Sequence, residues 1–186
     1  MTKAVLFDCF GVLYSDRLLA LFATHTHDDP RTFQAFQMLC RSADTGHLAA
    51  TDFWQGLADL MGLSVESCRH MVDAERRPNE LLWGNIARWK SAYKIGLISN
   101  AGQDIWEYIT PVYQRLFDAS IVSYQVGVTK PDPAIFTYAC TALGVAPQEV
   151  LFVDDSEANC AAARALGMKV VRYDGPGAMP EIEHLL

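Results

Sequence analysis

The chain has 186 residues and a formal net charge of −7, with 51% hydrophobic and 20% charged residues. This composition is typical of a globular protein and excludes wholesale disorder, and the length fits one domain or one domain with a small insert. The acidic balance argues against general nucleic-acid binding, which needs clustered Lys and Arg.

The first predicted element is a buried strand over residues 4–7, which are apolar at every position. Strands of a parallel sheet have this pattern because helices cover both of their faces. Four further apolar runs of the same kind follow at residues 95–98, 121–122, 150–153 and 170–171. The sequence therefore predicts several central strands of one parallel sheet.

Residues 15–91 contain no convincing strand and several amphipathic stretches. Over residues 51–61, apolar side chains recur at helical spacing after Thr51 as a predicted N-cap. The other helix candidates are residues 18–23, 33–39, 65–72 and 79–92. The run at 25–29 is interpreted as a polar loop because no second ligand group lies at metal-binding spacing. We predict a helical cap, 15–91, inserted into a core of residues 1–14 and 92–186.

Two later helices carry start and stop signals. Asp132 and Pro133 open one as N-cap and first helical residue, and Gly144 can end it. Ser156 opens an alanine-rich helix, and Gly167 stands where a left-handed residue ends helices. Strands that alternate with helices predict an α/β fold with a Rossmann-like, doubly wound parallel sheet.

The five cysteines are scattered and form no CxxC pair, so the sequence predicts neither a disulfide framework nor a zinc site. The first apolar stretch is too short for a signal peptide, and no apolar run approaches the ~20 residues of a membrane span. We expect a cytoplasmic protein with reduced thiols that binds neither a membrane nor nucleic acid.

Polar side chains follow the predicted strands, where open α/β sheets bind ligands. The residues at these strand ends are Asp8, Ser99, Asn100, Asp154 and Asp155. Lys130 lies just before the helix that Asp132 opens. Taken alone, each of these residues is typical of a turn, a helix cap or a solvated surface. Their joint occurrence at one edge of the sheet is what indicates a functional site.

This set of side chains suits phosphoryl transfer. A carboxylate such as Asp8 can attack phosphorus and form an aspartyl-phosphate, which splits one hard step into two. Mg²⁺ takes oxygen ligands, commonly one or two carboxylates with waters and substrate phosphate, and Asp8 and the Asp154–Asp155 pair can supply them. Lys130 can neutralise the phosphate, and the side chains after the second strand can donate hydrogen bonds to it.

These segments resemble the four motifs of the haloacid dehalogenase-like hydrolase superfamily in kind and order. The motif residues are Asp8-Cys9-Phe10-Gly11-Val12-Leu13, Ser99-Asn100, Lys130-Pro131-Asp132-Pro133 and Val153-Asp154-Asp155-Ser156 with Asn159. The helical segment between the first two motifs resembles the type I cap of that superfamily. The resemblance covers nearly the whole chain and is weakest in the cap.

The resemblance implies a role for each motif. Asp8 would be the nucleophile, and Lys130 would order the nucleophile and the phosphate. Ser99 and Asn100 would hold the phosphoryl oxygens. Taken together, these roles imply a hydrolase that acts on a small phosphorylated metabolite.

The resemblance also implies a Mg²⁺ site and exposes a departure from the family pattern. The ion would be held by Asp8, the backbone carbonyl of Phe10, and the acidic pair, with Asp155 as direct ligand and Asp154 acting through water. Phosphatases of the superfamily usually carry a second Asp two residues after the nucleophile, which protonates the leaving group and later activates water. Phe10 can do neither, and loss of a general acid/base costs ~10²–10⁴-fold.

Three functions follow from this departure. The favoured one is a magnesium-dependent phosphatase, with good leaving groups least affected. The second is a pseudo-enzyme that binds a phosphorylated ligand without turnover. The third is a metal-independent haloacid dehalogenase, since those enzymes also carry an aromatic residue at this place. The Asp154–Asp155 pair would leave negative charge beside an anionic haloacid, which favours the metal-dependent hydrolase. We expect a monomer or a homodimer.

Overall fold

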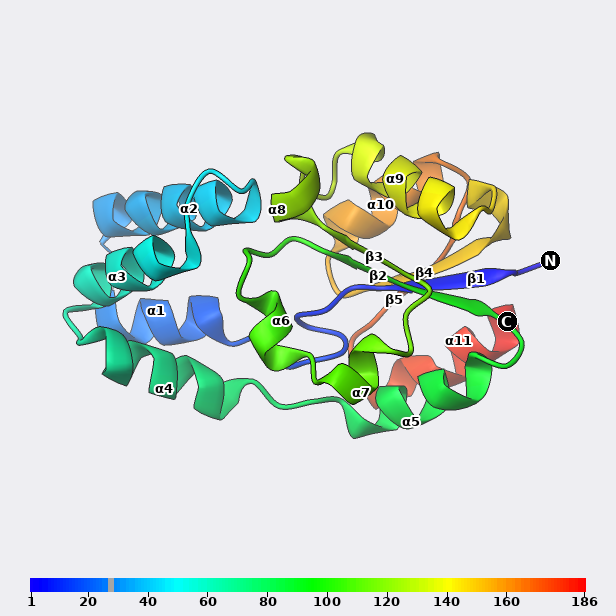
Figure 1. The fold of residues 1–186 in the computed structure, drawn as a ribbon, viewed down its shortest axis with the longest axis horizontal. Coiled ribbons are helices and arrows are strands. Elements are labelled where there is room, and N and C mark those ends of the chain that lie inside the picture. Colours follow the sequence, from blue (N-terminus) through cyan, green and yellow to red (C-terminus); the bar gives the residue numbers. More distant parts are fainter. Residues whose placement is uncertain (27–28) are drawn as a thin grey trace.

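The computed structural model describes residues 1–26 and 29–186. Within these residues, five parallel strands form one sheet in the order β3-β2-β1-β4-β5 (Figure 1). The strands are β1 (Ala4–Phe7), β2 (Lys94–Ser99), β3 (Ala119–Val122), β4 (Val150–Asp154) and β5 (Lys169–Arg172). The predicted α/β fold with a parallel sheet is confirmed. The polar loop expected at 25–29 includes residues 27 and 28, which lie outside the described residues.

Helices cover both faces of this sheet. One face carries α9 (Pro133–Leu143) and α10 (Glu157–Ala165), and the other carries α5 (Glu80–Trp89) and α11 (Met179–Leu185) (Figure 1). Successive β1 side chains enter opposite layers, because Leu6 joins the apolar cluster of α9 and Phe7 joins that of α5. Burial on both faces explains why every residue of β1 is apolar.

The helix signals are correct at two places and wrong at one. The side chain of Asp132 accepts a hydrogen bond from the amide of Ala134 at 2.8 Å, and Gly144 ends α9 with a φ of 63°. Gly167, with a φ of 86°, follows α10 as predicted. Thr51 is not the N-cap of α3 (Ala50–Met61), because the first helical turn closes on Ala49, whose carbonyl accepts the amide of Phe53 at 2.9 Å.

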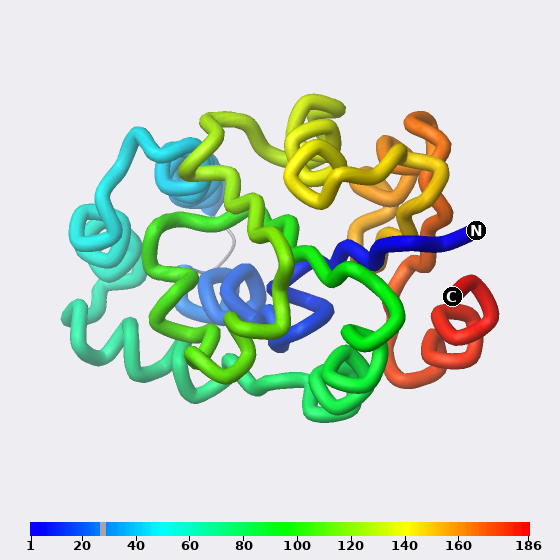
Figure 2. Tube along the Cα trace, turned by 45° about the vertical axis from the view of Figure 1, so that its right-hand side comes forward, coloured from blue at the N-terminus to red at the C-terminus, as the bar shows by residue number. Residues whose placement is uncertain are grey.

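A second helical layer lies beside the sheet, at the left of Figure 1. It consists of α1 (Leu18–Thr26), α2 (Pro30–Asp44), α3 and α4 (Val65–Glu75). These helices bury an apolar cluster of their own that includes Phe22, Phe36 and Trp54. We call α1–α4 the cap helices. Both chain termini lie at the sheet end remote from them (Figures 1 and 2).

Helix α5 lies within the predicted cap, 15–91, but packs against the sheet of the core. Its buried face of Leu82, Trp83, Ile86 and Trp89 packs in the cluster of the sheet, together with Val5 and Phe7 of β1. An amphipathic pattern predicts a buried face but does not say which partner covers it. We therefore propose that the cap ends with α4 and that α5 belongs to the core.

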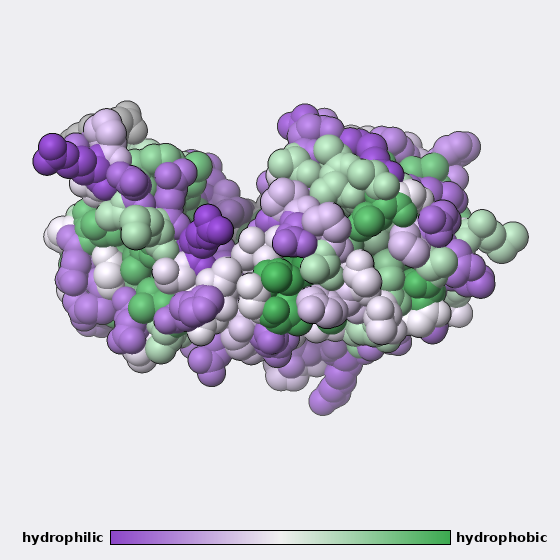
Figure 3. Space-filling model, turned by 90° about the horizontal axis from the view of Figure 1, so that it is seen from above, coloured by the Kyte–Doolittle hydropathy of each residue, from purple (hydrophilic) through white to green (hydrophobic). Residues whose placement is uncertain are grey.

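The two connections between core and cap lie against each other. The amide of Ser15 donates to the carbonyl of Arg77 at 3.0 Å, and the amide of Arg77 donates to Ser15 Oγ at 2.8 Å. The amide of Asn79 donates to the carbonyl of Leu13 at 2.8 Å. We call these paired segments, residues 13–16 and 76–79, the hinge. Figure 3 shows a groove between the cap helices and the core.

The remaining elements are short and lacked a clear sequence pattern. They are α6 (Ile105–Tyr108), α7 (Pro111–Gln114), α8 (Ser123–Val126) and the 3₁₀ turns Pro147–Glu149 and Pro176–Ala178. Across residues 1–26 and 29–186, no helix combines the length and the apolar character that crossing a membrane demands.

Candidate active site

The central strands bring three of the predicted polar segments to one edge of the sheet. Strand β1 lies between β2 and β4, with Phe7 in register with Leu97 and Val153. Asp8 directly follows β1, while Ser99 and Asp154 are the last residues of β2 and β4. The strand order therefore places these residues on adjacent strands, although they are far apart in the sequence.

Lys130 connects two of these strand ends. Its ammonium lies 2.7 Å from Asp8 Oδ1 and 2.7 Å from Asp154 Oδ2, and all three residues are buried. Burial raises the pKa of Asp8, and the charge of Asp154 adds to this effect, while Lys130 opposes it. The pKa of Lys130 is raised, because its two carboxylate partners outweigh the lowering effect of burial. The buried ammonium is thus held in its charged form.

The two acidic residues after β4 have different surroundings. The carboxylate of Asp154 accepts hydrogen bonds from the amide of Ser156 at 2.9 Å and from Asn159 Nδ2 at 3.0 Å. The Asp155 residue is exposed. Asp8, Asp154 and Asp155 each offer a carboxylate oxygen, and these oxygens lie within 4.8 Å of one another. This oxygen-only donor set fits a hard divalent cation such as Mg²⁺.

Gly11 is needed for this arrangement of carboxylates. Its φ is 94°, and a Cβ at this position would lie 2.3 Å from Asp155 Oδ2. Any larger residue would be strained and would displace the Asp155 carboxylate. The glycine was visible in the sequence only as part of a motif, because nothing local predicts its contact with a residue so distant along the chain.

Ser99 and Asn100 are differently engaged. The Asn100 side chain accepts the amide of Lys130 at 2.7 Å and donates to the carbonyl of Lys130 at 2.9 Å, so it clamps the backbone of that lysine. The Ser99 hydroxyl is buried and makes no hydrogen bond with any of the described residues. A buried hydroxyl without a partner is costly, so Ser99 has an unused hydrogen-bond donor, although the residue lines neither of the cavities described below.

Phe10 forms an aromatic wall beside these groups. Its ring packs edge-on against Tyr108, with 6.1 Å between the ring centroids. The guanidinium of Arg76 lies 4.1 Å from the centre of the Phe10 ring and 4.0 Å from that of Tyr108. Cation–π contacts of this kind hold both rings in place. Nothing in the sequence pattern indicated Arg76, which reaches the site from the hinge.

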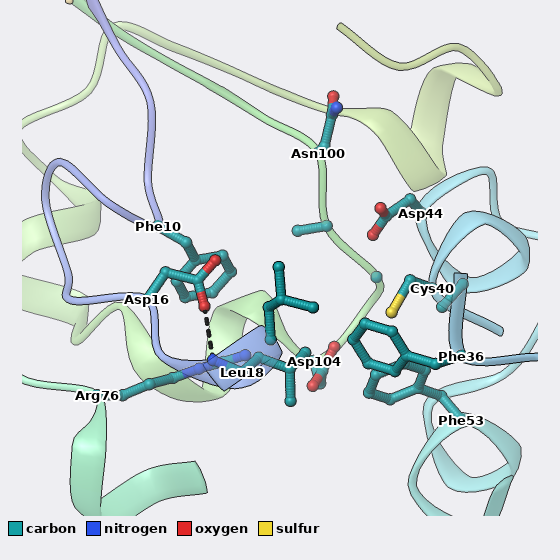
Figure 4. Close-up of a pocket in the computed structure, with 14 residues that line it drawn as sticks. Phe10, Asp16, Leu18, Phe36, Cys40, Asp44, Phe53, Arg76, Asn100 and Asp104 are labelled. Carbon is teal, nitrogen blue, oxygen red and sulfur yellow. Dashed lines mark hydrogen bonds between the residues drawn. The ribbon is translucent and has the colours of Figure 1, made fainter. Parts of the chain in front are cut away.

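Two neighbouring cavities meet at Phe10. The first, here called the strand-end cavity, has a volume of about 190 Å³ and is lined by Asp8, Phe10, Asp16, Asn100, Lys130, Asp155 and Asn159. The second, the cap cavity, has a volume of about 220 Å³ and lies between core and cap helices (Figure 4). Phe10, Asp16 and Asn100 line both cavities. A molecule bound at the strand ends can therefore extend beneath the cap helices.

The walls of the cap cavity combine apolar and acidic side chains. Phe36 and Phe53 come from the cap helices, and Arg76 comes from the hinge (Figure 4). Asp44, at the end of α2, has its pKa raised to about 7 by burial and by the charges of Asp104 and Asp16. These cap residues were not singled out by the sequence, because residues from three helices and three loops form the cavity.

Comparison with known proteins identifies relatives with two different activities. A family model described as haloacid dehalogenase-like hydrolase matches residues 2–167. (S)-2-haloacid dehalogenase 4A of Burkholderia cepacia is 26% identical over 147 residues, and the match spans 71% of this chain but only 63% of that enzyme. D-ribitol-5-phosphate phosphatase of Bacteroides thetaiotaomicron is 26% identical over 190 residues, which are 91% of this chain and 90% of that enzyme.

A solved structure shares the fold. The enzyme bt-2542 of Bacteroides thetaiotaomicron, in complex with magnesium and inorganic phosphate, superposes with a TM-score of 0.77. The match covers 100% of both chains at 23% sequence identity. At this identity the likeness shows a common architecture of sheet and helices.

Proposed function

The chain belongs to the haloacid dehalogenase-like hydrolases, and from that premise we propose that it is a magnesium-dependent phosphatase acting on small phosphorylated metabolites. The observation that carries the proposal is the buried ammonium of Lys130 between Asp8 and Asp154, with the carboxylate of Asp155 beside them. A phosphatase among the relatives, matched along most of both chains, supports the same activity.

The metal site follows from the oxygen-only donor set. Mg²⁺ would be held by Asp8, Asp155 and the backbone carbonyl of Phe10, with Asp154 acting through water. When bound, the ion supplies positive charge that lets an anionic phosphoryl group approach an anionic carboxylate. A solved structure of the same fold that holds magnesium and inorganic phosphate supports the choice of the metal.

The remaining steps belong to the side chains of this protein. The Asp8 carboxylate attacks phosphorus, the bond to the leaving oxygen breaks, and an aspartyl-phosphate forms. Lys130 opposes the rise that burial causes in the pKa of Asp8, which favours the attacking carboxylate, and it neutralises part of the phosphoryl charge. The free hydroxyl of Ser99 donates to a phosphoryl oxygen, while Asn100 fixes the backbone of Lys130. Water then hydrolyses the aspartyl-phosphate and releases inorganic phosphate.

Charge argues for this activity over dehalogenation. The strand ends carry three carboxylates against one ammonium, which repels an anionic haloacid unless a cation is bound. An aromatic residue at position 10 and a dehalogenase among the relatives are the observations that favour the alternative. A halide needs no proton when it leaves, so Phe10 would be no handicap there.

A substrate panel tests the proposal. The purified chain is assayed with ribitol 5-phosphate, phosphoserine, 4-nitrophenyl phosphate and acetyl phosphate, each with Mg²⁺ and with a chelator. We expect Mg²⁺-dependent phosphate release that Asp8→Asn lowers by about 10⁴-fold or more, the scale expected when a covalent nucleophile is removed. Asp59→Asn, at an exposed position of α3 that lines neither cavity, is the control.

Three results contradict the proposal. Phosphate release that ignores Mg²⁺, or that survives Asp8→Asn, excludes the mechanism. Chloride release from 2-chloropropionate without metal favours the dehalogenase. Tight phosphate binding without turnover on any member of the panel favours the pseudo-enzyme.

A further inference from the structure

The proposed reaction needs a general acid and base, and Phe10 cannot fill that role. An alkoxide leaving group needs a proton as its bond to phosphorus breaks, and the attacking water must lose one afterwards. A phenyl ring can neither give nor take a proton. Another side chain at the boundary between the strand-end cavity and the cap cavity is needed for alkyl phosphates.

Asp16 lies at that boundary. It lines both cavities, as do Phe10 and Asn100, but it alone of these three carries a carboxyl group, which can both give and take a proton. A substrate with its phosphorus beside Asp8 and its remainder under the cap helices would have its leaving oxygen where the two cavities join. Asp16 is one of the residues that line this junction.

The other ionisable groups of the strand-end cavity are already engaged. Asp8 and Lys130 pair with each other, and Asp155 belongs to the carboxylate cluster. Asp44 lines the cap cavity but not the strand-end cavity. By elimination, Asp16 is the carboxyl group in the strand-end cavity without an assigned role.

The local structure holds Asp16 in place and leaves one of its oxygens available. Its Oδ1 accepts the amide of Leu18 at 3.1 Å, drawn as the dashed line in Figure 4. Among the described residues, none donates a hydrogen bond to the other oxygen, Oδ2. The preceding residue, Ser15, is fixed by hydrogen bonds with the backbone of Glu75 and Arg77. The hinge therefore positions this carboxylate relative to the core.

We propose that Asp16 is the general acid and base of the reaction, in place of a carboxylate at residue 10. As Asp8 attacks phosphorus, the protonated Asp16 gives its proton to the leaving oxygen, which departs as an alcohol. The resulting Asp16 carboxylate takes a proton from the water that attacks the aspartyl-phosphate. The phosphorus–oxygen bond to Asp8 breaks, inorganic phosphate leaves, and Asp16 is again protonated. This inference rests on the proposed phosphatase function.

Asp16→Asn tests the role without disturbing the fold. An asparagine keeps the side-chain oxygen that accepts the Leu18 amide but cannot exchange a proton. We expect kcat/KM for ribitol 5-phosphate to fall by ~10²–10⁴-fold, and that for 4-nitrophenyl and acetyl phosphates, whose leaving groups need little protonation, to fall by less than about tenfold. Asp59→Asn, which removes one exposed carboxylate elsewhere, is expected to leave both values unchanged.

Two further readouts separate chemistry from a structural role. Asp16→Asn loses the base for the second step, so acid quenching during turnover of 4-nitrophenyl phosphate is expected to trap more phosphorylated enzyme than in the wild type. Phe10→Asp introduced into Asp16→Asn is expected to restore most of the activity toward ribitol 5-phosphate, whereas in the wild type it adds little.

The failures of the two proposals are distinguishable. If the wild type releases phosphate, Asp8→Asn does not, and Asp16→Asn matches the wild type on ribitol 5-phosphate, only the role of Asp16 is overturned. Equal losses on all substrates, without trapped phosphoenzyme or rescue by Phe10→Asp, also overturn it. If the wild type hydrolyses no phosphate, both proposals are wrong.

Discussion

The core and the cap helices treat their polar side chains differently. At the strand ends of the core, Asp8, Lys130 and Asp154 are buried and satisfied by one another. In the cap cavity, Asp44 is shielded from water beside the like charges of Asp104 and Asp16. In the core, fixed ion pairs offset the desolvation cost of the buried charges. In the cap cavity, Asp44 has like charges nearby, which raise its pKa together with burial. Under the proposed function, this contrast separates residues that carry out the chemistry from residues that select the substrate.

The largest effect is expected from removing the ammonium of the core. Lys130→Met leaves Asp8 and Asp154 as uncompensated buried carboxylates, so we expect a loss of about 3–5 kcal/mol in the free energy of unfolding, together with loss of turnover. Urea denaturation measures the stability. Lys90→Met breaks the partly exposed pair with Asp118 and is expected to cost about 1 kcal/mol or less. Equal losses in the two variants would remove the distinction between buried and surface pairs.

The next effect concerns metal affinity. Gly11→Ala pushes a Cβ against the Asp155 carboxylate, and we expect Mg²⁺ binding measured by calorimetry to weaken by about 10–100-fold. Gly127→Ala is a matched control, because Gly127 also has a positive φ, of 72°, but a Cβ there meets no atom within 4 Å. Unchanged Mg²⁺ affinity in Gly11→Ala would contradict the assignment of Asp155 as a ligand.

A smaller effect is expected on the pH dependence of stability. Folding raises the pKa of Asp44 from 3.8 to about 7, so between these values the folded chain holds a proton that the unfolded chain has released. Stability contributed by protonated Asp44 is therefore lost as pH rises through this interval. Asp44→Asn is expected to gain on the order of 1 kcal/mol over the wild type at pH 8 and nothing at pH 3, measured by urea denaturation at both pH values.

Asp118 of the core is expected to change the pH dependence of stability in the opposite direction to Asp44. Lys90 and the amide of Ile95 outweigh burial and lower the pKa of this carboxyl group. Its contribution is present at neutral pH and is lost as pH falls through the lowered pKa. Asp118→Asn is therefore expected to destabilise the protein at pH 8 and to match the wild type in strong acid. The same sign for Asp44→Asn and Asp118→Asn would contradict the contrast between cap and core.

The smallest effect is expected at the cap wall. Leu19 lines the cap cavity and is 54% exposed, so Leu19→Ala costs little stability. We expect a several-fold rise in KM for substrates with larger leaving groups, with kcat unchanged, from the loss of about 1 kcal/mol of apolar contact. Met38→Ala, also exposed but lining neither cavity, serves as control. A fall in kcat with unchanged KM would show that the wall acts in chemistry.

The core site was predictable because each of its signals is local. A run such as Ala4–Phe7 indicates a buried strand, and the polar residue after it then lies at the sheet edge. Parallel order brings Asp8, Ser99 and Asp154 together without further information. The contact of Asn100 with the backbone of Lys130 was not predictable, because it depends on how two loops meet.

The cap side was less predictable, because its residues come together through contacts between segments that are distant in the sequence. Amphipathic spacing predicts helices such as α3, but it does not say which helices share a core, and α5 packs on the sheet. Arg76 and Asp16 occupy the hinge, where no periodicity exists, and they reach the site through the pairing of two segments distant in sequence. Residues of this kind become visible only when the chain is folded.

The central claim is that Asp8 carries a phosphoryl group during turnover. The direct measurement is acid quenching of the Mg²⁺-loaded protein during turnover of 4-nitrophenyl phosphate, followed by mapping of the modified peptide by mass spectrometry. We expect phosphate on Asp8 in the wild type and no adduct in Asp8→Asn. Turnover without an adduct, or phosphate attached to another residue, would contradict it.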